Sequence, residues 1–278
     1  MRKIERVLRP QLRNVLWQIK RPILAQMNPH ALAFYKQVLE SAYKPNELID
    51  VLFEQRILYI AVPKAACSRI RATLSAIIGR DAISPGKIHN RRVSGLRAPR
   101  HGLVHFYEIG NDPRALRFSF VRNPYDRILS CWADQYRGKP LIPGDRYIDM
   151  YLNLKQQFDN ALPEGADQTL PFADFARLVS ANADRRVDMH WQLQSDILDV
   201  PGLTLNYIGK IEKFDTDFTR VLDHAGVHNE LRQLANQPIH SSRHRRTADY
   251  FTDALAARVY RAYERDFDTF GFSKKLPG

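Results

Sequence analysis

The stretch that decides the fold is RILYIAVPKAACSRIRATL, residues 56–74. Its first seven residues are mostly β-branched, aromatic or aliphatic, and a proline follows them, which is typical of a buried strand in a parallel sheet. Residues 68 to about 78 then have the composition of a helix. A strand, a tight loop and a helix in this order leave free backbone amides at the helix N-terminus, where α/β proteins hold phosphate groups.

A second junction of the same kind follows further along the chain. Residues 116–121, LRFSFV, predict another buried strand, and Arg122 stands at its end. Asn123, Pro124 and Asp126 then supply an N-cap, a proline at the first helical position and an acid in the first turn, so a helix is expected over residues 124–136. Two anion-binding junctions predict a ligand that is charged at both ends.

Composition bounds the kind of protein. The chain has 278 residues, of which 44% are hydrophobic, so one large α/β domain is as plausible as two small ones. A formal charge of +12 implies an anionic partner: nucleotide, acidic glycan, nucleic acid and membrane surface are all compatible. The two cysteines, Cys67 and Cys131, lie inside the two junctions, so a disulfide framework is not expected.

The segments outside the junctions are less specific. Apolar and basic residues alternate at helical spacing over residues 3–25, and this basic helix can either rest on an anionic membrane surface or cover the main core. We therefore predict an N-terminal helical segment, residues 1–50, packed on a main domain, residues 51–278. Residues 81–100 predict a mobile basic loop. Further helices are expected near residues 30–42, 171–182, 215–225 and 252–266, and a short strand at 204–208.

No apolar run approaches the roughly 18 residues that a membrane-spanning helix needs, and the N-terminus lacks the apolar core of a signal peptide. These observations predict a cytoplasmic protein, with peripheral contact between the N-terminal basic helix and an anionic membrane as an option.

The two junctions resemble the cofactor motifs of the carbohydrate sulfotransferases that use 3′-phosphoadenosine 5′-phosphosulfate (PAPS). Residues 63–74 are similar to that family's Pro-Lys-x-Ala-Cys-Thr/Ser-x-x-Lys/Arg-x-x-Leu loop, closest to the chondroitin and dermatan branch, and residues 121–130 to its Val-Arg-x-Pro-x-x-Arg-x-x-Ser element. Weaker similarities at residues 190–192, 207–212 and 263–271 extend the resemblance over about 56–272. Eukaryotic members usually carry an N-terminal membrane anchor, so the chain resembles either a soluble, bacterial-type member or a shortened one, and Met1 favours the former.

The resemblance implies an α/β fold of the P-loop-like sulfotransferase type, with a central parallel sheet flanked by helices. It also implies transfer of a sulfuryl group from PAPS to a hydroxyl of a carbohydrate or glycoconjugate. PAPS carries about four negative charges near neutral pH and needs donors at both ends. No metal is expected, because the sequence shows none of the familiar spacings of metal ligands.

The resemblance also assigns residues to the donor. Lys64 would offset charge that develops on the leaving phosphate, and Arg122 and Ser130 would hold the 3′-phosphate. A basic segment before the last helix recurs around the nucleotide in such enzymes. The predicted donor-binding residues are Pro63, Lys64, Ala65, Ala66, Cys67, Ser68, Arg69, Arg122, Ser130, Arg243 and Arg246.

An acceptor hydroxyl is a poor nucleophile and needs a general base near neutral pH, which favours histidine. Residues 101–105, HGLVH, are similar to the His-Gly-His region of uronyl 2-O-sulfotransferases, although Leu103 replaces the second histidine. His190 lies in a His-Trp element that the chondroitin branch shares, and it can equally orient substrate or fill space. Lys64, His101 and His190 are therefore the catalytic candidates, with His105 weaker, and the identity of the base stays open.

Two other classes compete with this interpretation. A nucleotide-dependent kinase would use a Gly-x-x-x-x-Gly-Lys-Ser/Thr loop, which the sequence lacks, since its Gly-Lys pairs are followed by Ile88, Pro140 and Ile211. A nucleic-acid-binding protein would explain the charge but not the motifs, so no nucleic acid is expected as partner. The sequence does not identify the acceptor, and its basic loops favour an acidic glycan.

Overall fold

The computed structural model of the protein describes residues 28–41, 43–80, 83–139, 169–185, 187–227 and 246–277. The predicted basic helix over residues 3–25 and the predicted donor contact Arg243 lie outside the described residues. None of the helices in the described ranges combines the length and the apolar character that crossing a bilayer requires.

A four-stranded sheet forms the centre, in the order β1 (Ile49–Leu52), β2 (Ile57–Ile60), β3 (Leu116–Val121) and β4 (Tyr207–Lys210). Strands β2, β3 and β4 are parallel, which confirms the predicted central parallel sheet. Strand β1 was not predicted and runs antiparallel to β2, because a turn over residues 53–56 connects them directly and a short turn can join only antiparallel neighbours. Strand β4 begins three residues later than predicted.

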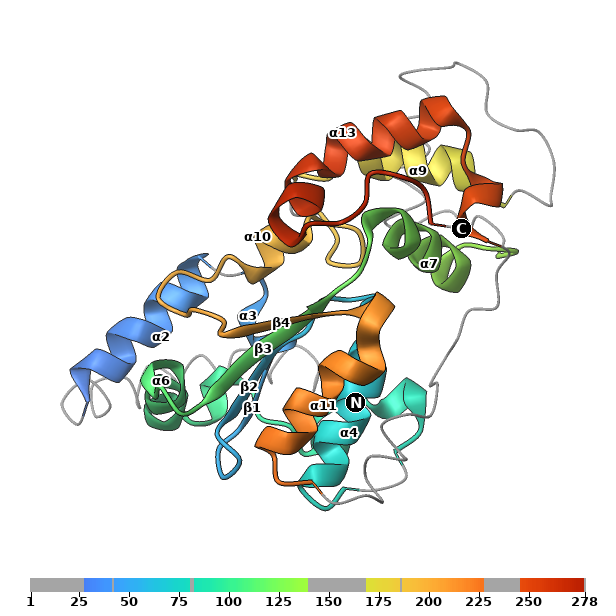
Figure 1. The fold of residues 1–278 in the computed structure, drawn as a ribbon. Helices are drawn as coiled ribbons and strands as arrows, with labels where there is room; N and C mark the ends of the chain where they lie inside the picture. The colour runs from blue at the N-terminus through green and yellow to red at the C-terminus, as the bar shows by residue number, and fades with distance from the viewer. Residues whose placement is uncertain are drawn as a thin grey trace, which may run out of the picture.

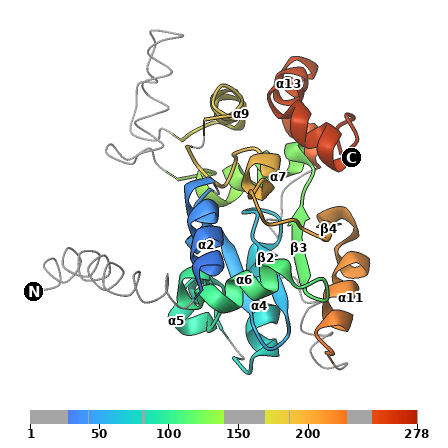
Figure 2. The ribbon, with the colours of Figure 1, turned by 90° about the vertical axis from the view of Figure 1, so that its left-hand side faces the viewer.

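Helices cover both faces of this sheet (Figure 1). Helices α2 (Pro29–Ser41) and α6 (Leu103–Asn111) lie on one face, and α4 (Cys67–Ile77) and α11 (Phe214–His224) lie on the other (Figure 2). Phe120 of β3 packs against Phe214 and Phe218 of α11, with ring centroids 5.1 and 5.8 Å away. A Cβ at Gly209 would lie 2.5 Å from the Phe120 ring, so this close contact requires glycine in β4.

A second hydrophobic core lies beyond the carboxyl end of β3. It is formed by helices α7 (Pro124–Gln135), α9 (Phe172–Ser180) and α13 (Asp253–Phe270), with α10 (Gln194–Leu198) against α13 (Figure 1). Trp191, Tyr263 and Phe267 are fully buried in or beside it. The residues that follow the parallel strands therefore lie between the two cores, which is where open α/β sheets bind ligands.

The segment that follows α4 contains short helices that the prediction of a loop over residues 81–100 did not include, and the mobility of this loop stays a prediction. Residues 83–101 contain η1 (Pro85–Lys87), α5 (Arg91–Ser94) and η2 (Pro99–His101). The guanidinium of Arg91 pairs with the fully buried carboxylate of Asp50 and donates to the carbonyl of Ile49 at 2.9 Å. A buried carboxylate needs such a partner, and this requirement fixes the segment on the sheet edge.

The predicted division of the chain after residue 50 stays a prediction. Strand β1 contains residues on both sides of that division, and the short helix α3 (Pro45–Leu48) leads directly into it. Helix α2 packs on α6, which belongs to the predicted main domain.

Candidate functional site

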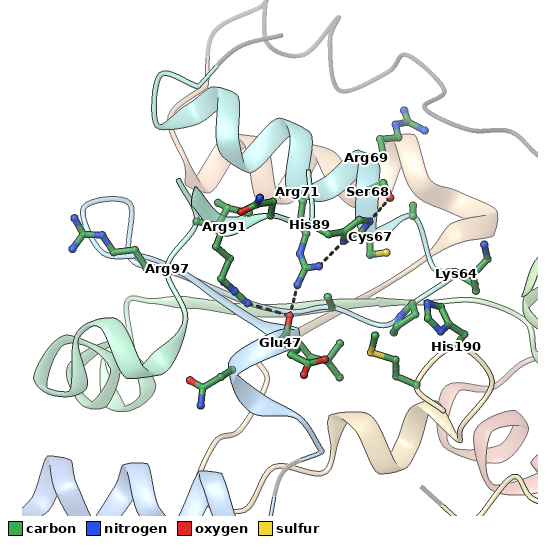
Figure 3. A pocket seen from close by; sticks show the side chains of 18 of the residues that line it. Glu47, Lys64, Cys67, Ser68, Arg69, Arg71, His89, Arg91, Arg97 and His190 are labelled. Carbon is green, nitrogen blue, oxygen red and sulfur yellow. Dashed lines mark hydrogen bonds between the residues drawn. The ribbon is translucent and has the colours of Figure 1, made fainter. Parts of the chain in front are cut away.

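A cavity of about 1170 Å³ opens at the carboxyl ends of the parallel strands and is lined by both junctions (Figure 3). Eight of its lining residues are lysine or arginine and only two are acidic, so it suits an anionic ligand. The charged and polar residues that line it are Asn46, Glu47, Lys64, Ser68, Arg69, Arg71, His89, Asn90, Arg91, Arg92, Arg97, Arg100, His101, Arg122, Ser130, Asp134 and His190.

The first junction is a tight turn between β2 and α4. Lys64 and Ala66 have φ of 69° and 56°, in the left-handed region that residues other than glycine seldom adopt. Ala66 is the N-cap of α4 and offers no side-chain acceptor to the first amides of the helix. Because Ala66, Cys67 and Ser68 all line the cavity, the turn presents this uncapped helix N-terminus to a bound anion.

Lys64 extends its ammonium along the wall of the cavity. Its Nζ lies 2.9 Å from Oδ2 of Asp134, in α7. The side chain of Asp134 is 62% exposed, whereas that of Lys64 is 15% exposed. An ion pair with such a solvated carboxylate is weak, so an anionic ligand in the cavity can compete for Lys64.

The second junction holds Arg122 by its backbone. The amide of Arg122 donates to Oε1 of Gln194 at 2.9 Å, and Nε2 of Gln194 donates to the carbonyl of Arg122 at 2.8 Å. Asp266, from α13, accepts from the amides of Gln194 and Ser195 at 2.8 Å each and so fixes Gln194. Burial lowers the pKa of Arg122, and the carboxylates of Asp126 and Glu212 oppose this shift.

Arg127 joins the two junctions, and the sequence interpretation did not assign it to the site. It is 1% exposed, and its guanidinium donates to the carbonyls of Pro63 at 3.0 Å, Met189 at 2.8 Å and Gln192 at 2.5 Å. One buried side chain thereby positions the first junction relative to the segment that carries His190. The sequence did mark Arg127 in one way, because it is the second arginine of the motif at residues 121–130.

His190 and His101 both line the cavity but differ in the partners of their ring nitrogens. Nδ1 of His190 lies 2.7 Å from Oδ1 of the buried Asp188, and since a carboxylate only accepts, this nitrogen carries the hydrogen of the neutral ring. Its Nε2 then keeps a lone pair. Nδ1 of His101 instead accepts from the amide of Ala98 at 3.0 Å, and Nε2 of His101 lies 3.4 Å from Nε of Arg100, which also donates. His190 therefore has the arrangement of a base that a carboxylate orients, with Nε2 as the nitrogen that accepts.

The other predicted site residues fall into three groups. Ser130 and Arg69 line the cavity, and Arg69 pairs with Asp215 at 2.8 Å. Ala65 is buried in the core behind the loop. His105 and Arg246 lie outside the lining: His105 is exposed beside Glu108, and Arg246 pairs with Asp249 at 3.5 Å.

Sequence reasoning also missed a chain of polar contacts behind the first junction, formed by Asp50, Arg71, His89 and Ser68. The sequence marked Arg71, because it occupies the Lys/Arg position of the motif at residues 63–74. His89 carried no signal, because its place beside Ser68 depends on how residues 83–90 fold back onto α4.

Within the described ranges, no group of three or more His, Cys, Asp or Glu side chains is arranged to hold a metal ion. The expectation that no metal is needed stays a prediction.

Together the sheet, the uncapped helix and the basic cavity define an α/β protein with an anion site at the carboxyl ends of its strands. A model of the sulfotransferase family matches residues 49–273, and the chain belongs to that family. No solved structure matches the chain significantly.

Several curated relatives are carbohydrate sulfotransferases. Carbohydrate sulfotransferase 14 of Danio rerio is 24% identical over 79% of this chain and 60% of its own length. Carbohydrate sulfotransferase 11 of Mus musculus is 23% identical over 82% of this chain and 68% of its own length. Carbohydrate sulfotransferase 8 of Homo sapiens is 24% identical over 84% of this chain and 58% of its own length. The match thus spans about three-fifths to two-thirds of each relative.

Proposed function

We propose that this protein is a sulfotransferase that moves the sulfuryl group of PAPS to a hydroxyl of a carbohydrate or glycoconjugate. The observation that carries the proposal is that both anion-binding junctions line one basic cavity, as a donor charged at both ends requires. Family membership and the names of the relatives support the same activity.

Each group of residues in the cavity can be assigned to one part of such a donor. The amides at the start of α4, the hydroxyl of Ser68 and the ammonium of Lys64 would bind the 5′ end, and Arg122 with Ser130 would bind the 3′-phosphate. PAPS would supply the sulfuryl group and leave as adenosine 3′,5′-bisphosphate. Lys64 would offset the negative charge that builds up on the leaving phosphate.

His190 is our proposed general base. Asp188 holds Nδ1–H, so Nε2 is the atom that would take the proton of the acceptor hydroxyl. Replacing His190 by alanine should lower kcat by about 10²–10⁴-fold, the usual contribution of a positioned base. His101→Ala should lower kcat far less, because both ring nitrogens of His101 already face donors, the amide of Ala98 and Nε of Arg100.

We further propose that the acceptor is acidic. Arg92, Arg97 and Arg100 are exposed and line the cavity without belonging to either junction. Figure 3 shows Arg97 at the opposite end of the cavity from Lys64 and His190. Guanidinium groups there suit a carboxylate or sulfate of a glycan bound beside the donor. Arg97→Ala should raise KM for an acidic acceptor without changing donor affinity, and Arg114→Ala, outside the cavity, is the matched control.

The first experiment is calorimetric titration with adenosine 3′,5′-bisphosphate, with ATP and AMP as competitors. We expect binding that depends on the 3′-phosphate and that weakens in Arg122→Ala but not in Arg114→Ala. Binding of ATP in preference would favour the kinase alternative. Indifference to all three nucleotides, with salt-dependent binding to DNA or RNA, would favour a nucleic-acid-binding protein.

The cytoplasmic location and the contact of residues 3–25 with an anionic membrane surface remain proposals. Binding of the full chain to vesicles that contain anionic lipid, compared with neutral vesicles, tests the membrane contact.

A further inference from the structure

Four polar side chains form a continuous chain behind the first junction. Asp50, in β1, accepts from Nε of Arg71 at 2.7 Å, and both side chains are buried. Nη1 of Arg71 lies 2.8 Å from Nδ1 of His89, and Nε2 of His89 lies 3.0 Å from Oγ of Ser68. Figure 3 shows Arg71, His89 and Ser68 in this order along one wall of the cavity.

The chemistry of arginine fixes the direction of every bond in this chain. A guanidinium has only donors, so Nδ1 of His89 must accept from Arg71. Partial burial and the adjacent charge of Arg71 lower the pKa of His89 to about 4, so the ring is neutral near pH 7. A neutral imidazole that accepts at Nδ1 carries its hydrogen on Nε2, and this hydrogen is donated to Ser68.

The hydroxyl of Ser68 is consequently committed to accepting from His89. Its own hydrogen must point elsewhere, and within the described ranges the side-chain hydrogen bond of this hydroxyl is the one with His89. Ser68 lines the cavity at the N-terminus of α4, so the free hydrogen is available to an anion bound there. A hydroxyl fixed as a donor binds an anion without first having to reorient.

We propose that His89 is a positioning residue, which, held by Arg71 and Asp50, fixes Ser68 as a hydrogen-bond donor to the 5′ group of the nucleotide. This inference rests on the proposed function, because it takes the anion at the first junction to be the 5′ end of the donor. His89 itself does not touch the reacting atoms. The alternative is that His89 only packs residues 83–90 onto α4.

The experiment is a double-mutant cycle with Ser68→Ala, His89→Ala and the combined variant, titrated with two ligands. Adenosine 3′,5′-bisphosphate carries the 5′ group, and adenosine 3′-monophosphate lacks it. Each single variant should bind the bisphosphate about tenfold more weakly, the effect of losing one hydrogen bond to a charged group. The combined variant should be no weaker than either single variant, and binding of the monophosphate should stay unchanged.

Two further variants separate positioning from packing. His89→Gln, whose side-chain amide can donate to Ser68, should restore most of the affinity for the bisphosphate. His105→Ala, at an exposed histidine of α6 outside the cavity, should bind both ligands as the wild type does.

Additive effects in the cycle, about a hundredfold in the combined variant, would overturn the proposal. Equal weakening of both ligands by His89→Ala would also overturn it, since a packing role affects the whole cavity. If the wild type does not bind the bisphosphate at all, the proposed function fails and this inference fails with it. If the wild type binds the bisphosphate but the effects of the two substitutions are additive, only this inference fails.

Discussion

The two junctions share the order strand, turn and helix but are supported by different parts of the chain. The first, between β2 and α4, is a turn with two left-handed residues. Two of its supporting contacts, His89 with Ser68 and Asp50 with Arg71, join residues about twenty positions apart in the chain. The second, between β3 and α7, holds Arg122 through Gln194, which is 72 residues away, and Gln194 depends in turn on Asp266.

This difference shows which parts of the chain position the groups of a binding motif. A short motif determines where the backbone turns, whereas the partners that hold its side chains and amides can come from any distance. The first junction has support from residues close in sequence as well as from Arg127 and Asp134, whereas the second is completed only when the C-terminal helix α13 is in place. Arg127 links them, because it lies in the second junction and binds the carbonyl of Pro63 in the first.

The largest expected effect comes from breaking this link. Arg127→Met would leave the carbonyls of Pro63, Met189 and Gln192 without their donor, and each buried unsatisfied carbonyl costs about 1–3 kcal/mol. We expect the free energy of unfolding to fall by about 3 kcal/mol or more, measured by urea denaturation. Arg177→Met, at an exposed arginine of α9, is the control and should be close to wild type. Equal stability of the two variants would contradict the role of Arg127.

The next effect concerns the first junction alone. Lys64→Ala should lower kcat by about 10²–10³-fold, the usual effect of removing one donor that stabilises developing charge, and should change affinity for adenosine 3′,5′-bisphosphate much less. Kinetics with an acceptor found by glycan screening, together with calorimetry, separate the two quantities. Lys213→Ala, an exposed lysine outside the cavity, is the control. A loss confined to affinity would make Lys64 a binding residue only.

A smaller effect should follow from disturbing the second junction at a distance. Gln194→Ala removes both hydrogen bonds that hold the backbone of Arg122. We expect adenosine 3′,5′-bisphosphate to bind about tenfold more weakly, since a misplaced guanidinium loses about one hydrogen bond to the 3′-phosphate. AMP, which lacks that phosphate, should bind as it does to the wild type. If AMP binding fell equally, the long-range support of Arg122 would not be specific to the second junction.

The smallest effect is expected at the exposed ion pair of the cavity. Asp134→Asn should tighten adenosine 3′,5′-bisphosphate binding a few-fold, because a pair with an exposed carboxylate contributes only about 0.2–1 kcal/mol and competes with the ligand for Lys64. The gain should shrink as salt is raised. Asp174→Asn, in α9, is the control. Weaker binding in Asp134→Asn would mean that Asp134 orients Lys64 for the ligand.

Most of the fold could be predicted from the sequence. The strands β2 and β3 and the helices α4 and α7 follow from local apolar patterns and from the N-cap at Asn123, whose side chain accepts from Tyr125 as expected. Strand β1 was missed because its four residues carry too short a pattern, and since all four are buried they show no alternation of apolar and polar positions. The folding of residues 83–101 was missed because it depends on the pairing of Arg91 with Asp50, 41 residues away.

The candidate site could be predicted in part. The sequence indicated Lys64, Ser68, Arg122 and Ser130, and the structure brings all four to one cavity, where their roles remain proposals. The sequence did not distinguish His101 from His190 as the general base, since the hydrogen-bond partners of each ring nitrogen are set only by folding.

The sequence by itself determined the two anion-binding junctions and the class of fold, because helix capping, strand composition and the residues of a tight turn act between near neighbours in the chain. Only the tertiary structure decided which side chains hold those junctions in place: Arg127, Gln194, Asp266 and His89. Their contacts depend on hydrogen-bond geometry between separate segments, about twenty residues apart for His89 and more than sixty for the other three, and no local pattern encodes that geometry.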